Sequence, residues 1–294
     1  MTSFGAVPAT GGRVFVRIGA GPRVGLVTAL TGASAAPRRA SLAVVGGALR
    51  VGGTSWVSHV DRLPAWPHCT PDELESGVRR LLKGFSLLGV VVPRQRTRER
   101  VSVLGTAMGN SVVLKVASDP GPIGREAEAL GQLSLRPIPS ITTARLLEHG
   151  TITVGDVEVC AVAMQHVHGM QRPAWKAPLQ LFGRHLTERL ADLPRPAGTP
   201  ADWTPQHGDL SPWNLRRTSR GLTLYDWEGC TWAPPETDRA YFESCVAAMK
   251  RGPAPSMSRA SHRHLIDMID HRAADAGSID APLRAVLDAA EVHD

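Results

Sequence analysis

The stretch QHGDLSPWNL (residues 206–215) decides how the rest of the chain is interpreted. It places a carboxylate at Asp209 and a carboxamide at Asn214. The short apolar run that follows at residues 222–225 predicts a strand, and this strand leads into Asp226 and Glu228. Phosphoryl transfer requires a carboxylate that accepts the proton of an attacking hydroxyl, together with oxygen ligands that hold a divalent metal against the phosphates. Because Mg²⁺ prefers carboxylate and amide oxygens, the stretch predicts a phosphotransferase site.

The order His-Gly-Asp-x-x-x-x-Asn followed by Asp-x-Glu resembles the catalytic core of the aminoglycoside phosphotransferase and choline kinase families, which are small-molecule relatives of the protein kinases. The alternative is a polar loop that carries these letters by accident. The resemblance covers roughly residues 99–245. It implies an α+β, bilobal protein-kinase-like fold, with a β-rich N-terminal lobe that holds one or two helices and a mainly α-helical C-terminal lobe.

We place the N-terminal lobe at residues 1–168 and the helical C-terminal lobe, with the catalytic loop and the acceptor site, at residues 169–294. Within the first lobe, residues 1–92 form a β-rich extension plus a helix, and residues 93–168 form the nucleotide-binding sheet and the helix that carries a glutamate. The resemblance assigns no role to the extension.

A lysine inside an apolar strand is the second feature that points to a nucleotide. Lys115 lies in the run Val-Leu-Lys-Val, where an ammonium group without an anion is costly. The resemblance implies that Lys115 binds the α- and β-phosphates and that Glu126, in a Glu-Ala-x-x-Leu-x-x-Leu helix, positions this lysine. A strand-edge lysine with acids on a helix surface is the alternative. The strand at residues 157–164 runs into Gln165 and Val167, whose backbone groups are expected to hold the adenine.

The remaining site roles also follow from the resemblance. Asp209 is the catalytic residue that accepts the hydroxyl proton, and Asn214 and Asp226 are metal ligands. Glu228 supports a second metal or its water shell. His207 braces the loop through hydrogen bonds, and Asp238 is the structural aspartate that follows the metal motif.

Local patterns predict the elements around these motifs. Thr70, Pro71 and Glu73 open a helix with a capping box. Residues 1–60 read as β-rich, with a short strand at residues 42–45 between a basic surface loop at residues 33–39 and glycine turns. Further strands are expected at residues 101–104, 112–116 and 144–147, and helices at residues 175–190, 238–250, 256–276 and 281–291.

Bulk composition sets the remaining expectations. The chain has 294 residues, is 43% hydrophobic and carries a formal net charge of +6. The basic excess lies in its N-terminal half, which suits an anionic nucleotide. Its four cysteines form no Cys-x-x-Cys pair, and it shows neither a signal pattern nor an apolar run of membrane-spanning length. We therefore expect a cytoplasmic protein with neither membrane nor nucleic acid as a partner.

Together these features predict an enzyme that moves the γ-phosphoryl group of ATP to a hydroxyl of a small molecule, with Mg²⁺ as cofactor and GTP not excluded. The acceptor is an antibiotic, a sugar or a nucleoside-like compound, and an antibiotic-resistance kinase is one form. A metabolite or sugar kinase of a biosynthetic pathway is one alternative. A kinase-like module whose N-terminal region docks a partner is the other. The segment between Asp226 and Glu236 is too short for the peptide-docking platform of a protein kinase.

Overall fold

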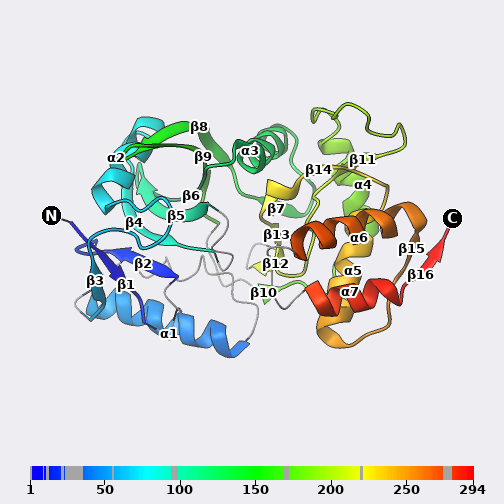
Figure 1. Cartoon of the computed structure of the whole chain (residues 1–294), viewed down its shortest axis with the longest axis horizontal. Helices are drawn as coiled ribbons and strands as arrows, with labels where there is room; N and C mark the ends of the chain where they lie inside the picture. Colours follow the sequence, from blue (N-terminus) through cyan, green and yellow to red (C-terminus); the bar gives the residue numbers. More distant parts are fainter. Residues whose placement is uncertain are drawn as a thin grey trace. The chain divides into compact units, whose positions relative to one another are not determined.

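The computed structural model describes residues 2–8, 10, 13–20, 23, 36–54, 56–93, 99–167, 172–218, 221–273 and 280–294. The chain divides into two compact units (Figure 1). The first comprises Met1–Gly124 and Arg145–Val167, and the second comprises Arg125–Ala144 and His168–Asp294. Residues 125–144, which we expected in the N-terminal lobe, therefore group with the second unit.

The first unit is built on an antiparallel sheet, which has eight strands in the described part of the chain, in the order β3-β1-β2-β4-β5-β6-β9-β8. Its strands are β1 (Phe4–Ala6), β2 (Val14–Arg17), β3 (Ser58–Val60), β4 (Ser86–Val91), β5 (Arg100–Ala107), β6 (Asn110–Ala117), β8 (Leu146–Val154) and β9 (Val157–Gln165). β5 and β6 form a hairpin around Met108 and Gly109, which both have positive φ (48° and 79°). Two consecutive turn residues with positive φ give a hairpin turn whose twist matches the right-handed twist of the two strands.

Two helices cover the sheet of the first unit. The helix α2 (Pro71–Leu81) begins with the predicted capping box, since Thr70 and Glu73 exchange hydrogen bonds with each other's backbone N–H. Leu74 of α2 packs with Leu87 of β4 in one apolar cluster, whereas Leu49 of α1 (Ala36–Gly52) packs with Leu88 in a second. Because neighbouring strand residues point to opposite faces, the two helices serve opposite faces of β4.

The prediction of a strand at residues 42–45 and of a loop before it is wrong, because residues 36–52 form the helix α1. Val45 and Leu49 are one helical turn apart and both belong to the second cluster, where Leu49 is fully buried. This burial outweighs the unfavourable helix propensity of Gly46 and Gly47. The predicted loop residues 33–35 lie outside the described residues.

The second unit is mainly helical. It contains most of α3 (Pro120–Leu135), then α4 (Leu179–Arg189), α5 (Thr237–Lys250), α6 (Arg259–Ala273) and α7 (Asp280–Asp288). Side chains of α5, α6 and α7 form one apolar core. The α+β class predicted from the sequence is confirmed. None of the helices in the described ranges combines the length and hydropathy that a bilayer crossing requires.

Short strands of the second unit carry the loops of interest. β10 (Arg172–Pro173), β12 (Leu215–Thr218), β13 (Gly221–Leu224) and β7 (Ile141–Thr143) form a sheet in that order. β11 (Thr204–Gln206) pairs with β14 (Thr231–Ala233), and β15 (Ser256–Ser258) pairs with β16 (Glu291–His293). The loop at residues 207–214 therefore connects β11 to β12, and the turn at residues 226–230 connects β13 to β14.

Candidate active site

The loop at residues 207–214 brings Asp209 and Asn214 into direct contact. The Asn214 Nδ2 donates to the backbone oxygen of Asp209 at 3.0 Å and to its carboxylate Oδ2 at 3.1 Å. Asn214 is buried, while Asp209 is half-buried and so retains access to solvent. Because the amide nitrogen is committed to Asp209, the orientation of the carboxamide is fixed and its oxygen is the atom that can bind a cation.

Two glycines bring this loop against the turn that carries Asp226. Gly208 has a φ of +78°, and a Cβ built there would lie 1.9 Å from the backbone oxygen of Gly229. Gly229 in turn lies next to the Cβ of Asp209, since its own Cβ would be 3.5 Å from that atom. The two segments therefore pack main chain against main chain, which no side chain at residue 208 would permit.

His207 is fully buried and joins the same two segments. Its Nδ1 accepts the backbone N–H of Asp209 at 3.2 Å, and its Nε2 lies 2.9 Å from the backbone oxygen of Tyr225. The first bond requires a bare Nδ1, so the ring proton is on Nε2 and is donated to Tyr225. The ring also packs 4.6 Å from the Trp227 ring, between centroids. With both nitrogens engaged, His207 holds the loop in place.

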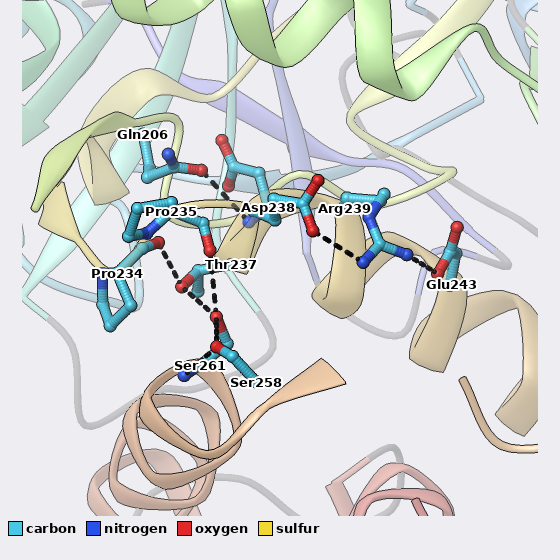
Figure 2. A network of polar contacts seen from close by, with 10 residues as sticks. Gln206, Pro234, Pro235, Thr237, Asp238, Arg239, Glu243, Ser258 and Ser261 are labelled. Atoms are coloured by element: carbon cyan, nitrogen blue, oxygen red, sulfur yellow. Dashed lines mark hydrogen bonds and ion pairs between the residues drawn. The ribbon is translucent and has the colours of Figure 1, made fainter. Parts of the chain in front are cut away.

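Asp238 supports the start of the loop from the first turn of α5. Its carboxylate accepts the backbone N–H groups of His207 at 2.6 Å and Gly208 at 3.0 Å. Its own N–H donates to Gln206 Oε1 at 3.1 Å (Figure 2). Burial raises the pKa of Asp238, while His207 and the two N–H groups act in the opposite direction. The aspartate thus satisfies backbone donors that would otherwise be buried without acceptors.

A second set of hydrogen bonds anchors the start of α5 to α6. The hydroxyl of Thr237 donates to the backbone oxygen of Pro234 at 2.7 Å and lies 3.3 Å from the Ser261 hydroxyl, which donates to Pro235 (Figure 2). Both hydroxyl-bearing residues are buried. The segment that presents Asp238 is therefore fixed on both sides.

The turn with Asp226 and Glu228 is held by α3. Asp226 has a left-handed backbone (φ 68°) and precedes the short 3-10 helix η2 (Trp227–Gly229). The buried Glu126 accepts the backbone N–H of Trp227 at 3.3 Å through Oε1, and Arg125 Nε donates to the backbone oxygen of Glu228 at 3.0 Å. Glu126 therefore contacts the turn that carries the predicted metal ligands Asp226 and Glu228, in addition to its expected role with Lys115.

The residues predicted as metal ligands suit a hard cation. Asn214 offers an amide oxygen, and Asp226 and Glu228 offer carboxylates on half-buried side chains. Oxygen donors of this kind match Mg²⁺. Among the described residues, no three side chains of His, Cys, Asp or Glu gather as a metal centre. The predicted set differs from such a centre because one of its ligands is a carboxamide.

The other predicted nucleotide-binding residues lie in the first unit. Lys115 is half-buried on β6, between Ser102 of β5 and Val162 of β9. Gln165 ends β9, and its N–H donates to the backbone oxygen of Arg145 at 2.9 Å, while Val167 follows as a buried residue. Since Glu126, Asn214 and the acids belong to the second unit, their action with Lys115 on one nucleotide stays a prediction.

Four residues of the site were missed by the sequence analysis. Ser211 accepts the backbone N–H of Asn214 through its hydroxyl at 3.3 Å, and its spacing of three residues is a recognisable turn signal. Gln206, Gly229 and Arg216 gave no comparable signal. Their roles depend on partners that are distant in sequence or on the opposite strand.

No family model matches this chain, and no curated protein matches it in sequence. Solved structures do match. They include aminoglycoside phosphotransferases and other small-molecule kinases.

An aminoglycoside-3'-phosphotransferase of type VIII is 22% identical, with a TM-score of 0.41, and the match covers 74% of this chain and 98% of that one. The amicoumacin kinase hAmiN, in complex with AMP-PNP, Ca²⁺ and Ami, is 12% identical, with a TM-score of 0.42 and coverage of 73% and 83%. A thermostable mutant of the aminoglycoside phosphotransferase APH(4)-Ia, with ADP and hygromycin B, is 10% identical, with a TM-score of 0.45 and coverage of 74% and 98%.

Proposed function

We propose that this chain is a small-molecule kinase that transfers the γ-phosphoryl group of ATP to a hydroxyl of its acceptor. The observation that supports this proposal is the bond from Asn214 to the Asp209 carboxylate, in a loop that packs directly on the Asp226 turn. A carboxylate with solvent access thus lies in one assembly with a second carboxylate and an oriented amide oxygen. Phosphoryl transfer to a hydroxyl needs this set of groups.

In the proposed mechanism, Asp209 orients the acceptor hydroxyl and accepts its proton as the oxygen attacks the γ-phosphorus. The bond between the γ-phosphorus and the oxygen that bridges to the β-phosphate breaks, and ADP leaves. Asn214 and Asp226 would hold Mg²⁺, and Glu228 would support a second ion or its water shell. When bound, such an ion offsets the negative charge of the phosphates. His207 and Asp238 keep the loop in place.

The first unit contributes the nucleotide contacts of the proposal. Lys115 binds the α- and β-phosphates, and Glu126 positions Lys115. Backbone groups of Gln165 and Val167 hold the adenine. The basic excess of the N-terminal half favours binding of a polyanion such as ATP.

We infer that the acceptor is an antibiotic, a sugar or a nucleoside-like compound, so the enzyme serves either antibiotic resistance or a biosynthetic pathway. We also place the activity in the cytoplasm. The four cysteines support this location, because none of them forms a disulfide and three of them are buried.

The test is turnover by two carboxylate variants. We expect Asp209→Asn and Asp226→Asn each to lower Mg²⁺- and ATP-dependent phosphorylation by about a thousandfold or more, because each removes a charge needed in the transition state. ADP release, measured with a panel of hydroxyl-bearing antibiotics, sugars and nucleosides, identifies the acceptor first. Asn tolerates the left-handed backbone at residue 226, so this variant should keep its melting temperature.

Asp202→Asn is the matched control, since Asp202 is an exposed aspartate of the same unit. It should turn over like the wild type. Normal turnover by either carboxylate variant would reject the assignment, and so would a wild-type protein that shows no thermal shift with Mg²⁺ and AMP-PNP.

A further inference from the structure

Arg216 lies on the same face of the β12–β13 hairpin as Asn214. In the register of this hairpin, Leu215 opposes Leu224 and Arg216 opposes Thr223. The backbone N–H of Tyr225 donates to Asn214 at 3.1 Å, which extends the pairing by one residue towards the loop. Because side chains alternate along a strand, Asn214, Arg216 and Tyr225 share one face, and the two leucines share the other.

The contacts of Arg216 reach both predicted metal segments. Its Nε donates to the backbone oxygen of Trp213, the residue before Asn214. Its guanidinium carbon lies 5.0 Å from the centroid of the Tyr225 ring, and Tyr225 is the residue before Asp226. Arg216 thus bridges the backbone of one ligand segment and the side chain next to the other ligand. The planar guanidinium suits this arrangement, since it stacks on the ring while its edge donates.

The charge of Arg216 acts on Asp226. Burial lowers the pKa of the Arg216 guanidinium, whereas the neighbouring Tyr225 and Asp226 raise it. Of these two neighbours, Asp226 is the carboxylate, and its negative charge interacts with the half-buried guanidinium. A fixed positive charge beside a metal ligand repels a divalent cation that binds to this ligand. The repulsion is strong at a partly buried position, where little water screens the two charges.

We infer that Arg216 is a positioning residue that holds Asp226 and makes divalent-ion binding depend on the nucleotide. Without nucleotide, Arg216 partly neutralises Asp226 and repels a divalent ion. When ATP binds, the negative charge of its phosphates offsets this repulsion. The divalent ion can then bind at Asp226 while Arg216 stays in place. This inference rests on the proposed function, because it takes Asp226 as a metal ligand and a nucleotide polyphosphate as the second ligand.

The experiment measures Mn²⁺ binding to the full-length protein by electron paramagnetic resonance, first alone and then with AMP-PNP. Mn²⁺ accepts the same oxygen ligands as Mg²⁺. We expect Arg216→Met to bind Mn²⁺ alone about tenfold more tightly than the wild type, since a nearby like charge is gone. The variant should also bind AMP-PNP more weakly, so that the nucleotide improves its Mn²⁺ affinity less than in the wild type.

Arg217→Met is the matched control. Arg217 is the next residue of β12, is exposed and points to the other face, so the substitution removes the same charge from the surface. It should leave Mn²⁺ binding and the effect of AMP-PNP unchanged. Arg216→Lys separates charge from shape. It should preserve the nucleotide dependence of Mn²⁺ binding while lowering the melting temperature, because lysine keeps the charge and loses the planar stack.

Equal Mn²⁺ affinity in Arg216→Met and Arg217→Met would overturn the inference and leave the proposed function standing. Tighter Mn²⁺ binding by Arg216→Lys to the same extent as by Arg216→Met would also overturn it. A wild-type protein that binds no Mn²⁺ even with AMP-PNP would overturn both. If Arg216→Met does not fold, Arg216→Gln takes its place with the same expectations.

Discussion

Gly208 is the residue at which the loop at residues 207–214 packs most tightly against the backbone of the Asp226 turn among the glycines of the two segments. Its φ is +78°, and a side chain would meet the backbone oxygen of Gly229. We expect Gly208→Ala to lower the free energy of unfolding by more than about 2 kcal/mol, because the main chain of one segment must move. Phosphoryl transfer should fall with it, since the same movement separates Asp209 from Asp226. Thermal melting and ADP release measure the two effects.

Gly198→Ala is the control for this prediction. Gly198 has a φ of +80°, and a Cβ there meets nothing within 4 Å. Alanine at this position should lower the free energy of unfolding by only about 1 kcal/mol, which is the cost of a left-handed backbone for a residue with a Cβ. If the two variants lost equal stability, the close approach at Gly208 would not be the cause.

The residues of the site differ in how far the sequence could predict them. Asp209, Asn214 and Asp226 were predicted from their residue types and their spacing, and this pattern is visible in the sequence alone. Gly229 and Arg216 matter because of what they face after folding. In the sequence, Gly229 follows Trp-Glu and Arg216 lies on a short strand, and neither position indicates a role in the site. Only the tertiary contacts of the two residues reveal their roles.

At the scale of elements, local signals succeeded where the backbone itself carries them. The predicted capping box of α2 depends on Thr70 and Glu73, which are three residues apart in the sequence. The helix α1 was missed because its stability comes from Leu49 in a distant apolar cluster, while Gly46 and Gly47 locally favour a turn. Tertiary burial overrode propensity in this case.

The helix α6 carries a histidine that should make stability depend on pH. The ring of His264 packs edge-on against Trp203, with centroids 5.5 Å apart, and burial lowers its pKa, although Asp267 opposes this. With a folded-state pKa below the ordinary value of 6.5, the unfolded chain takes up the proton first. The histidine therefore costs stability as the pH falls below about 6.5.

We expect His264→Phe to keep the ring contact and to lose less stability than the wild type between about pH 6.5 and pH 5. Melting temperatures across this range measure the difference. His293→Phe, at an exposed position of β16, should follow the wild-type curve. Parallel curves for the wild type and His264→Phe would contradict the prediction.

At the scale of the whole molecule, the N-terminal extension is part of the sheet that carries Lys115. β2 pairs with β4, and β4 continues through β5 to β6. Phe4 and Phe15 are buried in the same apolar cluster as Leu114, the residue before Lys115. The extension therefore shares its core with the predicted nucleotide-binding strands, which argues against a separable docking module.

The proposed kinase requires Lys115 of the first unit and Asp226 of the second to act on one nucleotide, and a double-mutant cycle tests this. Lys115→Met and Asp226→Asn should each weaken the binding of AMP-PNP with Mg²⁺, measured by calorimetry. If both act on the same polyphosphate, the loss in the double variant should differ from the sum of the single losses by about 0.5–3 kcal/mol. Lys83→Met removes an exposed lysine of the first unit and should combine additively with Asp226→Asn. Additivity between Lys115→Met and Asp226→Asn would mean that the two residues bind different ligands, and the kinase proposal would then fail.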